Sequence, residues 1–188
     1  PLTPRARQIV DVARELLESE GPEALTMRRL AHQLGIRAPS LYKHFPHKEA
    51  LEVSIILDGF EEAAAAFEAA ETQAAGAQGV ERLQSFVDVY RAFAKSHPHV
   101  YRLMTERPLP LAQLPEGLEA RTAAPLLRAT GDPVRARAAW AFIHGFTLLE
   151  LDDRLPADEL TEHAWQVGIQ QFSMISRDSL QSNSGTWR

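Results

Sequence analysis

Apolar residues recur every three to four positions along most of the chain, which is the period of an amphipathic helix. Ile9, Ala13, Leu16 and Leu17 form one such stripe near the start. No segment of useful length shows the strict alternation of a strand, and glycine and proline fall in clusters between long alanine- and leucine-rich segments. The pattern therefore predicts an all-α protein.

Turn residues and capping residues divide this pattern into helices. Thr3-Pro4, Thr26 and Asp132-Pro133 are typical helix starts. Residues 107–115 hold three prolines and are expected to form a loop. The helices are expected over about 4–19, 27–34, 38–44, 48–75, 79–96 and 99–106, then up to about 129, and over about 133–152 and 158–175.

The expected helices group into domains. Residues 1–46 are expected to form a three-helix domain, and 47–176 a second helical domain, with the helix 47–75 linking the two. The polar segment 177–188 is expected to be a disordered tail.

The segment from Thr26 to Lys48 stands out by its charge. It holds five Lys or Arg residues and no Asp or Glu, although the whole chain has a net charge of −5. Residues 1–50 have a balance of +2, and 51–188 a balance of −7. A local basic face in an acidic chain favours contact with a phosphate backbone.

The same segment has the spacing of a helix-turn-helix. Ala31 is small enough for two helices to approach closely, and Gly35 suits a sharp turn. Leu41 would anchor the second helix to the core. This spacing occurs by chance when it stands alone, but together with the basic run and the break at Pro46 it indicates a DNA-binding domain.

These residues resemble the TetR family of bacterial transcription regulators. The resemblance covers roughly residues 5–55 and is most specific in the string LYKHFPHKEAL at 41–51. Trp140, His144 and Gly145 are similar to the ligand-domain signature of a subgroup named for its Trp-His-Gly residues. Arg37 and His47 stand where the family often has capping residues, so both caps are expected to be weak.

The resemblance implies DNA contacts from the turn, the third helix and the start of the fourth. Phe45 is read as core instead, and His44 fits DNA contact and packing about equally. The expected DNA-binding residues are Thr26, Arg28, Arg37, Ala38, Pro39, Ser40, Tyr42, Lys43, His44 and Lys48.

The resemblance also implies a small-molecule effector and a homodimer. A largely apolar effector is expected beside Phe86, Tyr90, Phe93, Tyr101, Met104, Trp140 and His144, although each of these residues also fits plain core packing. The dimer is expected to form through helices 133–152 and 158–175, at Phe142, Gly145, Leu149, Leu160, Ala164, Val167, Gly168 and Phe172.

Other classes of function have little support. The chain has no cysteine, no nucleophile elbow and no glycine-rich phosphate loop, so we expect neither an enzyme nor a cofactor or metal. No apolar run approaches the length of a membrane span, and the first residues lack a signal peptide's apolar segment. A cytoplasmic protein without membrane contact is expected.

The sequence thus predicts a ligand-responsive regulator that binds double-stranded DNA, with a repressor released from a palindromic operator as the favoured form. An activator of the same fold fits the sequence as well. The alternative from another class is a helical ligand- or partner-binding protein whose first domain contacts proteins instead of DNA. The basic run at 26–48 argues against that alternative.

Overall fold

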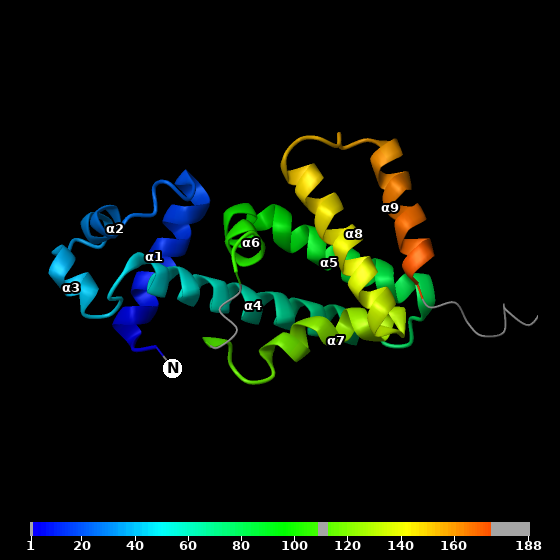
Figure 1. Ribbon diagram of the computed structural model, residues 1–188, viewed down its shortest axis with the longest axis horizontal. Coiled ribbons are helices and arrows are strands. Elements are labelled where there is room, and N and C mark those ends of the chain that lie inside the picture. Colours follow the sequence, from blue (N-terminus) through cyan, green and yellow to red (C-terminus); the bar gives the residue numbers. More distant parts are fainter. Residues whose placement is uncertain (1, 109–112, 174–188) are drawn as a thin grey trace, which may run out of the picture. The chain divides into compact units, whose positions relative to one another are not determined.

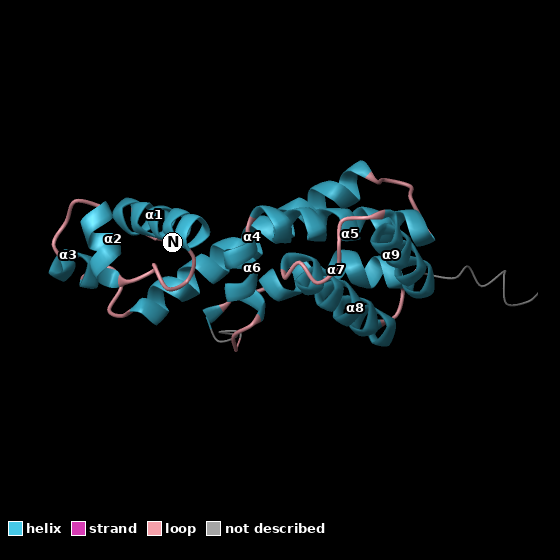
Figure 2. Ribbon diagram, turned by 90° about the horizontal axis from the view of Figure 1, so that it is seen from above, coloured by secondary structure: helices cyan, strands magenta, loops and turns pink. Residues whose placement is uncertain are grey.

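The computed structural model of this chain describes residues 2–108 and 113–173. These residues form helices joined by short loops and contain no strand (Figures 1 and 2). The all-α expectation is confirmed; the expected tail at 177–188 lies outside the described residues. The helices of the described part are α1 (Pro4–Glu20), α2 (Met27–Gln33), α3 (Ala38–Tyr42), α4 (Lys48–Gln73), α5 (Gly79–Ser96), α6 (Pro98–Thr105), α7 (Leu118–Thr130), α8 (Pro133–Leu151) and α9 (Glu159–Phe172).

The helices divide between two compact units. The described parts of residues 1–64 and 93–119 form the first unit, and those of 65–92 and 120–188 form the second. Helices α4, α5 and α7 each contribute residues to both units.

The first unit has an aliphatic core centred on α1. Ile9, Val10, Ala13, Leu16 and Leu17 of α1 are all buried, as the apolar stripe predicted. Other fully or almost fully buried residues in this unit come from α2, α3, α4 and α6, and they include Leu30, Leu41, Ile55 and Val100. This core fixes α2 and α3 on α1.

Helix α6 is tied to α1 and α4 by two contacts within the first unit. The Glu18 carboxylate of α1 accepts hydrogen bonds from the backbone N–H groups of His99 at 3.2 Å and Val100 at 2.8 Å. It therefore caps the first turn of α6, where unpaired N–H groups favour an acid. Gly59 of α4 lets α6 approach, because a β-carbon there would lie 2.5 Å from Sδ of Met104 and 3.0 Å from a methyl group of Val100.

The second unit is built around aromatic residues. Phe67 of α4 packs against Phe86 of α5 with ring centroids 4.6 Å apart, and Tyr90 stacks on Phe67 at 6.2 Å. Trp165 of α9 is completely buried and contacts Phe142 and Phe146 of α8. These contacts hold α9 against α8.

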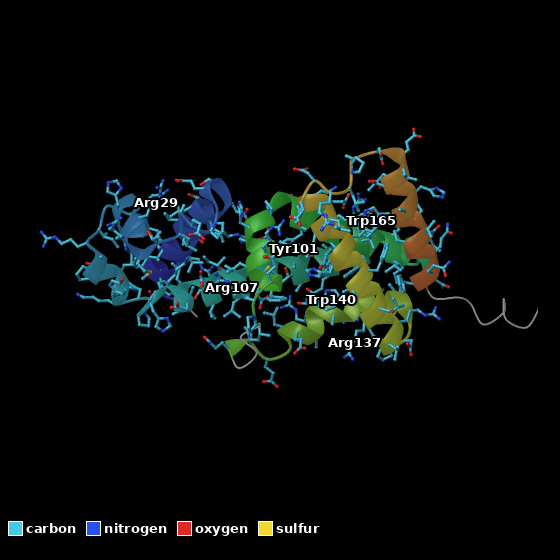
Figure 3. The ribbon with its side chains drawn as sticks, turned by 45° about the horizontal axis from the view of Figure 1, so that its top comes forward. Arg29, Tyr101, Arg107, Arg137, Trp140 and Trp165 are labelled. Atoms are coloured by element: carbon cyan, nitrogen blue, oxygen red, sulfur yellow. The ribbon has the colours of Figure 1, made fainter. Side chains whose placement is uncertain are left out.

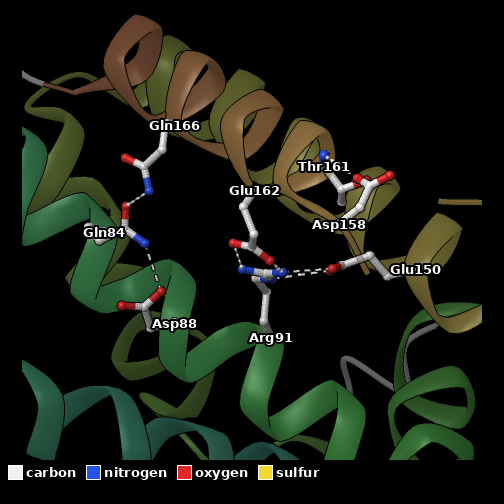
Figure 4. Close-up of polar contacts among 8 residues, drawn as sticks. All are labelled: Gln84, Asp88, Arg91, Glu150, Asp158, Thr161, Glu162 and Gln166. Carbon is white, nitrogen blue, oxygen red and sulfur yellow. Dashed lines mark hydrogen bonds and ion pairs between the residues drawn. The ribbon is translucent and has the colours of Figure 1, made fainter. Parts of the chain in front are cut away.

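A partly buried arginine joins α5 to α8 and α9 in this unit (Figure 4). Arg91 donates to Glu150 of α8 at 2.7 Å and to Glu162 of α9 at 2.6 Å. Its guanidinium also lies over the ring of Trp165, 4.8 Å from the centroid. Burial alone would lower the pKa of Arg91, but the hydrogen bonds to Glu162 and Glu150 outweigh this and raise the pKa. The guanidinium therefore stays charged and links three helices.

Candidate nucleic-acid interface

The turn between α2 and α3 has the geometry of a helix-turn-helix. Thr26 caps α2 by accepting a hydrogen bond from the Arg29 N–H at 3.2 Å. Gly35 follows α2 with φ of 64°, a left-handed conformation that glycine adopts without strain. The Ile36 N–H then donates to the Ala31 carbonyl at 2.9 Å and closes the turn. Both the cap and the glycine turn were predicted from the sequence.

Helix α3 is anchored by two apolar residues and exposes the rest. Leu41 is fully buried. Phe45, which follows shortly after the end of the helix, is also buried. The side chains between and before them are free to meet a partner, and Tyr42 is 48% exposed. Of the residues expected to bind DNA, Thr26, Arg28, Arg37, Pro39, Ser40, Tyr42, Lys43 and His44 are exposed, and Ala38 and Lys48 are partly exposed.

Arg37 and His47, both expected to be weak caps, differ in whether the side chain caps its helix. Arg37 stands at the N-cap of α3 without a side-chain cap, so its guanidinium is not used there. His47 does fill the cap of α4, because its Nδ1 accepts the Ala50 N–H at 3.2 Å. The ring nitrogen of His47 takes the place of the usual capping oxygen.

The basic charge at this face is partly matched by acids. Arg29 forms an ion pair with Glu20 of α1, whereas the exposed Arg28 and Lys43 form no ion pair with the described residues. Glu49 directly follows the basic run. A hydrogen bond from its own backbone N–H, together with His47 and Lys48, lowers the pKa of the Glu49 carboxyl. The candidate face thus keeps several cations available for phosphates.

Lys48 and Arg107 share one buried carboxylate in the first unit. Glu52 of α4 is 5% exposed. Lys48 Nζ lies 3.4 Å from its Oε1, and Arg107 donates to its Oε2 at 2.6 Å. The sequence analysis did not single out Glu52 or Arg107. The Lys48-Glu52 spacing of one helical turn was visible, but the partnership with Arg107 spans 55 residues and has no sequence signal.

The residues expected to bind an effector fall in both units. Phe93, Tyr101 and Met104 are buried in the first unit, and Phe86 and Tyr90 in the second. Trp140 of α8, labelled in Figure 3, is about half exposed. Its ring stacks on the ring of His144, with centroids 5.6 Å apart. A cavity of about 10 Å³ in the second unit is lined by Phe67, Phe86, Arg82, Pro125 and neighbours, and it has room for one water.

The residues expected at a dimer interface separate into two groups. Phe142, Gly168 and Phe172 pack between α8 and α9 of one protomer. Leu160 is 76% exposed, Val167 is 47% exposed, and Gly145 has no neighbour within 4 Å of a β-carbon position. Leu149 and Ala164 are partly exposed. The second group is at least partly exposed at the surface of the described chain.

Neither 2–108 nor 113–173 contains three His, Cys, Asp or Glu side chains grouped to hold a metal ion. No helix among the same residues is both long enough and apolar enough to cross a membrane.

Comparison with known proteins identifies both parts of the chain. Residues 9–54 match the family described as bacterial regulatory proteins, tetR family. Residues 83–172 match the C-terminal domain described as tetracyclin repressor-like. The second match is to this domain type, and the Trp-His-Gly subgroup suggested by Trp140, His144 and Gly145 is not shown.

Individual relatives agree with these matches. An HTH-type transcriptional regulator from Mycobacterium tuberculosis is 31% identical over 153 residues, which cover 76% of this chain and 68% of the relative. The class C tetracycline repressor protein from Escherichia coli is 51% identical over 43 residues, 23% of this chain and 20% of that protein.

A solved structure shares the fold. The TetR variant from Acinetobacter baumannii, crystallised in complex with minocycline, is 23% identical, with a TM-score of 0.60 over 92% of this chain and 94% of the other. The chain therefore belongs to the TetR family of helix-turn-helix transcriptional regulators, a family of DNA-binding proteins and not of enzymes.

Proposed function

We propose that this regulator is a homodimeric repressor that binds a palindromic operator through α3 and releases it when a small apolar molecule binds. The proposal that the protein binds DNA rests on the exposed face of α3. Tyr42 and Lys43 are solvent-exposed on a helix that Leu41 and Phe45 fix to the core. A short helix held rigidly with polar side chains outward suits insertion into a major groove.

The proposed contacts divide by their chemistry. Arg37, Ser40 and Tyr42 lie in the turn or on α3 and are assigned to base edges and nearby phosphates. Thr26, Arg28 and Lys43 are assigned mainly to phosphates, together with Lys48 at the start of α4. Ala38, Pro39 and His44 complete the face.

The DNA assignment is tested by substituting α3. Lys43→Ala should weaken binding to any duplex, with a salt dependence reduced by about 0.9 per protomer. Tyr42→Ala should weaken binding to the preferred sequence more than to a random one. Arg5→Ala is the control, because it removes an exposed cation from α1. Unchanged affinity in both α3 variants would refute the assignment, provided circular dichroism shows intact helices.

The dimer is proposed to form through the outer surfaces of α8 and α9. Apolar side chains on these two helices are exposed in the protomer, and Val134 reaches 78% exposure. A contiguous exposed apolar patch marks a contact with a partner, and these residues are assigned to one such patch. Pairing of two protomers would place two α3 helices about one DNA turn apart, ~34–36 Å.

The effector is proposed to be small and largely apolar. Phe67, Phe86 and Tyr90 form an aromatic cluster beside the small cavity of the second unit. That cavity is far below the ~300 Å³ that a drug-sized ligand needs, so the effector must bind a more open conformation. A similar protein of the same fold was crystallised with minocycline. Membership of the Trp-His-Gly subgroup stays a hypothesis that rests on Trp140, His144 and Gly145.

The effector proposal has its own test. An apolar compound set should contain a molecule that raises the melting temperature of the protein and lowers its affinity for DNA. Phe86→Ala should abolish the thermal shift for that molecule. A set that produces neither effect would leave a DNA-binding regulator without this input.

A further inference from the structure

Glu52 is a buried carboxylate close to the start of α4. It is 5% exposed, and two cations reach it from different helices of the first unit. Lys48 lies one turn before it on α4, and Arg107, labelled in Figure 3, lies just beyond the end of α6. A carboxylate taken out of water is costly unless a cation compensates it.

The two contacts with Glu52 differ in kind. Arg107 Nη1 donates to Oε2 at 2.6 Å, the length of a strong charge-assisted hydrogen bond. Lys48 Nζ lies 3.4 Å from Oε1, beyond the usual length of a hydrogen bond. Arg107 therefore supplies most of the compensation, and the Lys48 ammonium keeps donors for another partner.

Lys48 is placed to use those donors on DNA. Its side chain is 35% exposed, and it is the first residue of α4, where unpaired backbone N–H groups also favour a phosphate. Resting on the DNA-binding function proposed above, we infer that Arg107 is a positioning residue for that function: it satisfies Glu52 and leaves Lys48 free to contact a DNA phosphate.

The same geometry defines what happens when Arg107 withdraws. The buried carboxylate then has Lys48 as its nearest cation and draws the ammonium in, so that the phosphate contact is lost. A displacement of Arg107 is in this way converted into a loss of one phosphate contact per protomer. No residue of α3 has to move for DNA affinity to fall.

The inference is tested with the full-length protein and a random-sequence duplex of roughly 30 base pairs, three helical turns. The measured quantity is the slope of log affinity against log salt, which reports the number of phosphate contacts. The variants are Lys48→Ala, Arg107→Ala, Glu52→Gln and the double variant Arg107→Ala/Glu52→Gln. Arg102→Ala is the matched control, because it removes a cation from α6 that pairs with Glu106.

Lys48→Ala and Arg107→Ala should each reduce the slope by about 0.9 per protomer. Glu52→Gln should keep at least the wild-type slope, because Lys48 loses its competing acid. The slope of the double variant should match that of Glu52→Gln, since Arg107 has no carboxylate charge to compensate when Glu52 is replaced. Arg107→Lys should restore most of the wild-type slope, and Arg102→Ala should not change it.

Two results would overturn the inference. One is a wild-type slope in Arg107→Ala, and the other is a double variant that binds as weakly as Arg107→Ala alone. The second result would mean that Arg107 acts on DNA directly or through overall charge. Failure of the proposed function looks different: the wild-type protein itself would not bind the duplex, or would bind it without salt dependence.

Discussion

The ring of Phe142 on α8 occupies the space that a β-carbon on Gly168 of α9 would need. Glycine at this position therefore permits the close approach of the two helices within one protomer. The sequence analysis assigned Gly168 to close packing between protomers, whereas the structure shows its neighbour in its own chain.

Gly168→Ala should destabilise the protein by about 1–3 kcal/mol, because the added methyl group overpacks the contact with Phe142. Chemical denaturation measures the effect. Phe142→Leu removes ring atoms, so it should cost less in the Gly168→Ala background than in the wild type. Additive losses in the double variant would show that the two residues do not share this space.

Arg91→Ala should destabilise the second unit more than any surface substitution. The side chain of Glu150 is 7% exposed. Removal of Arg91 would leave its charge buried and without this cation, at a cost of ~3–5 kcal/mol. Glu162→Gln should cost less than about 1 kcal/mol, because Glu162 is 56% exposed. Equal losses in the two variants, measured by urea denaturation, would contradict this ranking.

The stability of the second unit should fall in acid. A hydrogen bond from Arg128 lowers the pKa of Glu71 below its usual 4.5, and one from Arg121 does the same for Glu68. Their contributions are therefore complete above the ordinary carboxyl pKa and are lost as the pH falls through the lowered values. Unfolding should be followed between about pH 6 and pH 2. The stability of Arg128→Gln should change less over this range than that of the wild type. An identical pH profile would show that the Glu71–Arg128 pair does not contribute to the loss of stability in acid.

Local features of the fold were predictable, and partnerships between distant residues were not. Thr3, Thr26 and Asp132 each cap the helix that the sequence assigned to them, because a cap depends on neighbours only three residues away. The caps supplied by Glu18 to α6 and the ion pairs of Arg91 link residues 59 to 82 positions apart. No periodic pattern in the sequence indicates contacts between residues so far apart in the chain.

The candidate site shows the same division. The exposed face of α3 and the left-handed Gly35 follow from motif spacing. The extent of exposure on α8 did not follow from its composition, since its sequence carries apolar residues almost all round the helix. In the protomer, Trp140 and Val134 are exposed, and only Ala139, Ile143 and Thr147 of α8 are fully covered.

Leu160→Asp should convert the proposed dimer into a monomer. The side chain is 76% exposed in the protomer, so its replacement should leave the helices of one chain intact. A buried charge in the interface would oppose association, and the monomer should bind DNA more weakly. Gln166→Asp adds the same charge to α9 on the side where Gln166 donates to Gln84 of α5, and this variant should stay dimeric. A dimeric Leu160→Asp variant in light scattering would exclude this surface.

Selection of duplexes from a random pool by the purified protein, followed by sequencing, tests the central claim most directly. A homodimer reading DNA with two α3 helices should enrich an inverted repeat whose half-sites lie about 10 base pairs apart, centre to centre. Tyr42→Ala should lose this enrichment or alter the half-site. A pool that stays random after repeated rounds with the wild-type protein, under salt conditions where it binds DNA, would contradict sequence-specific recognition by this face.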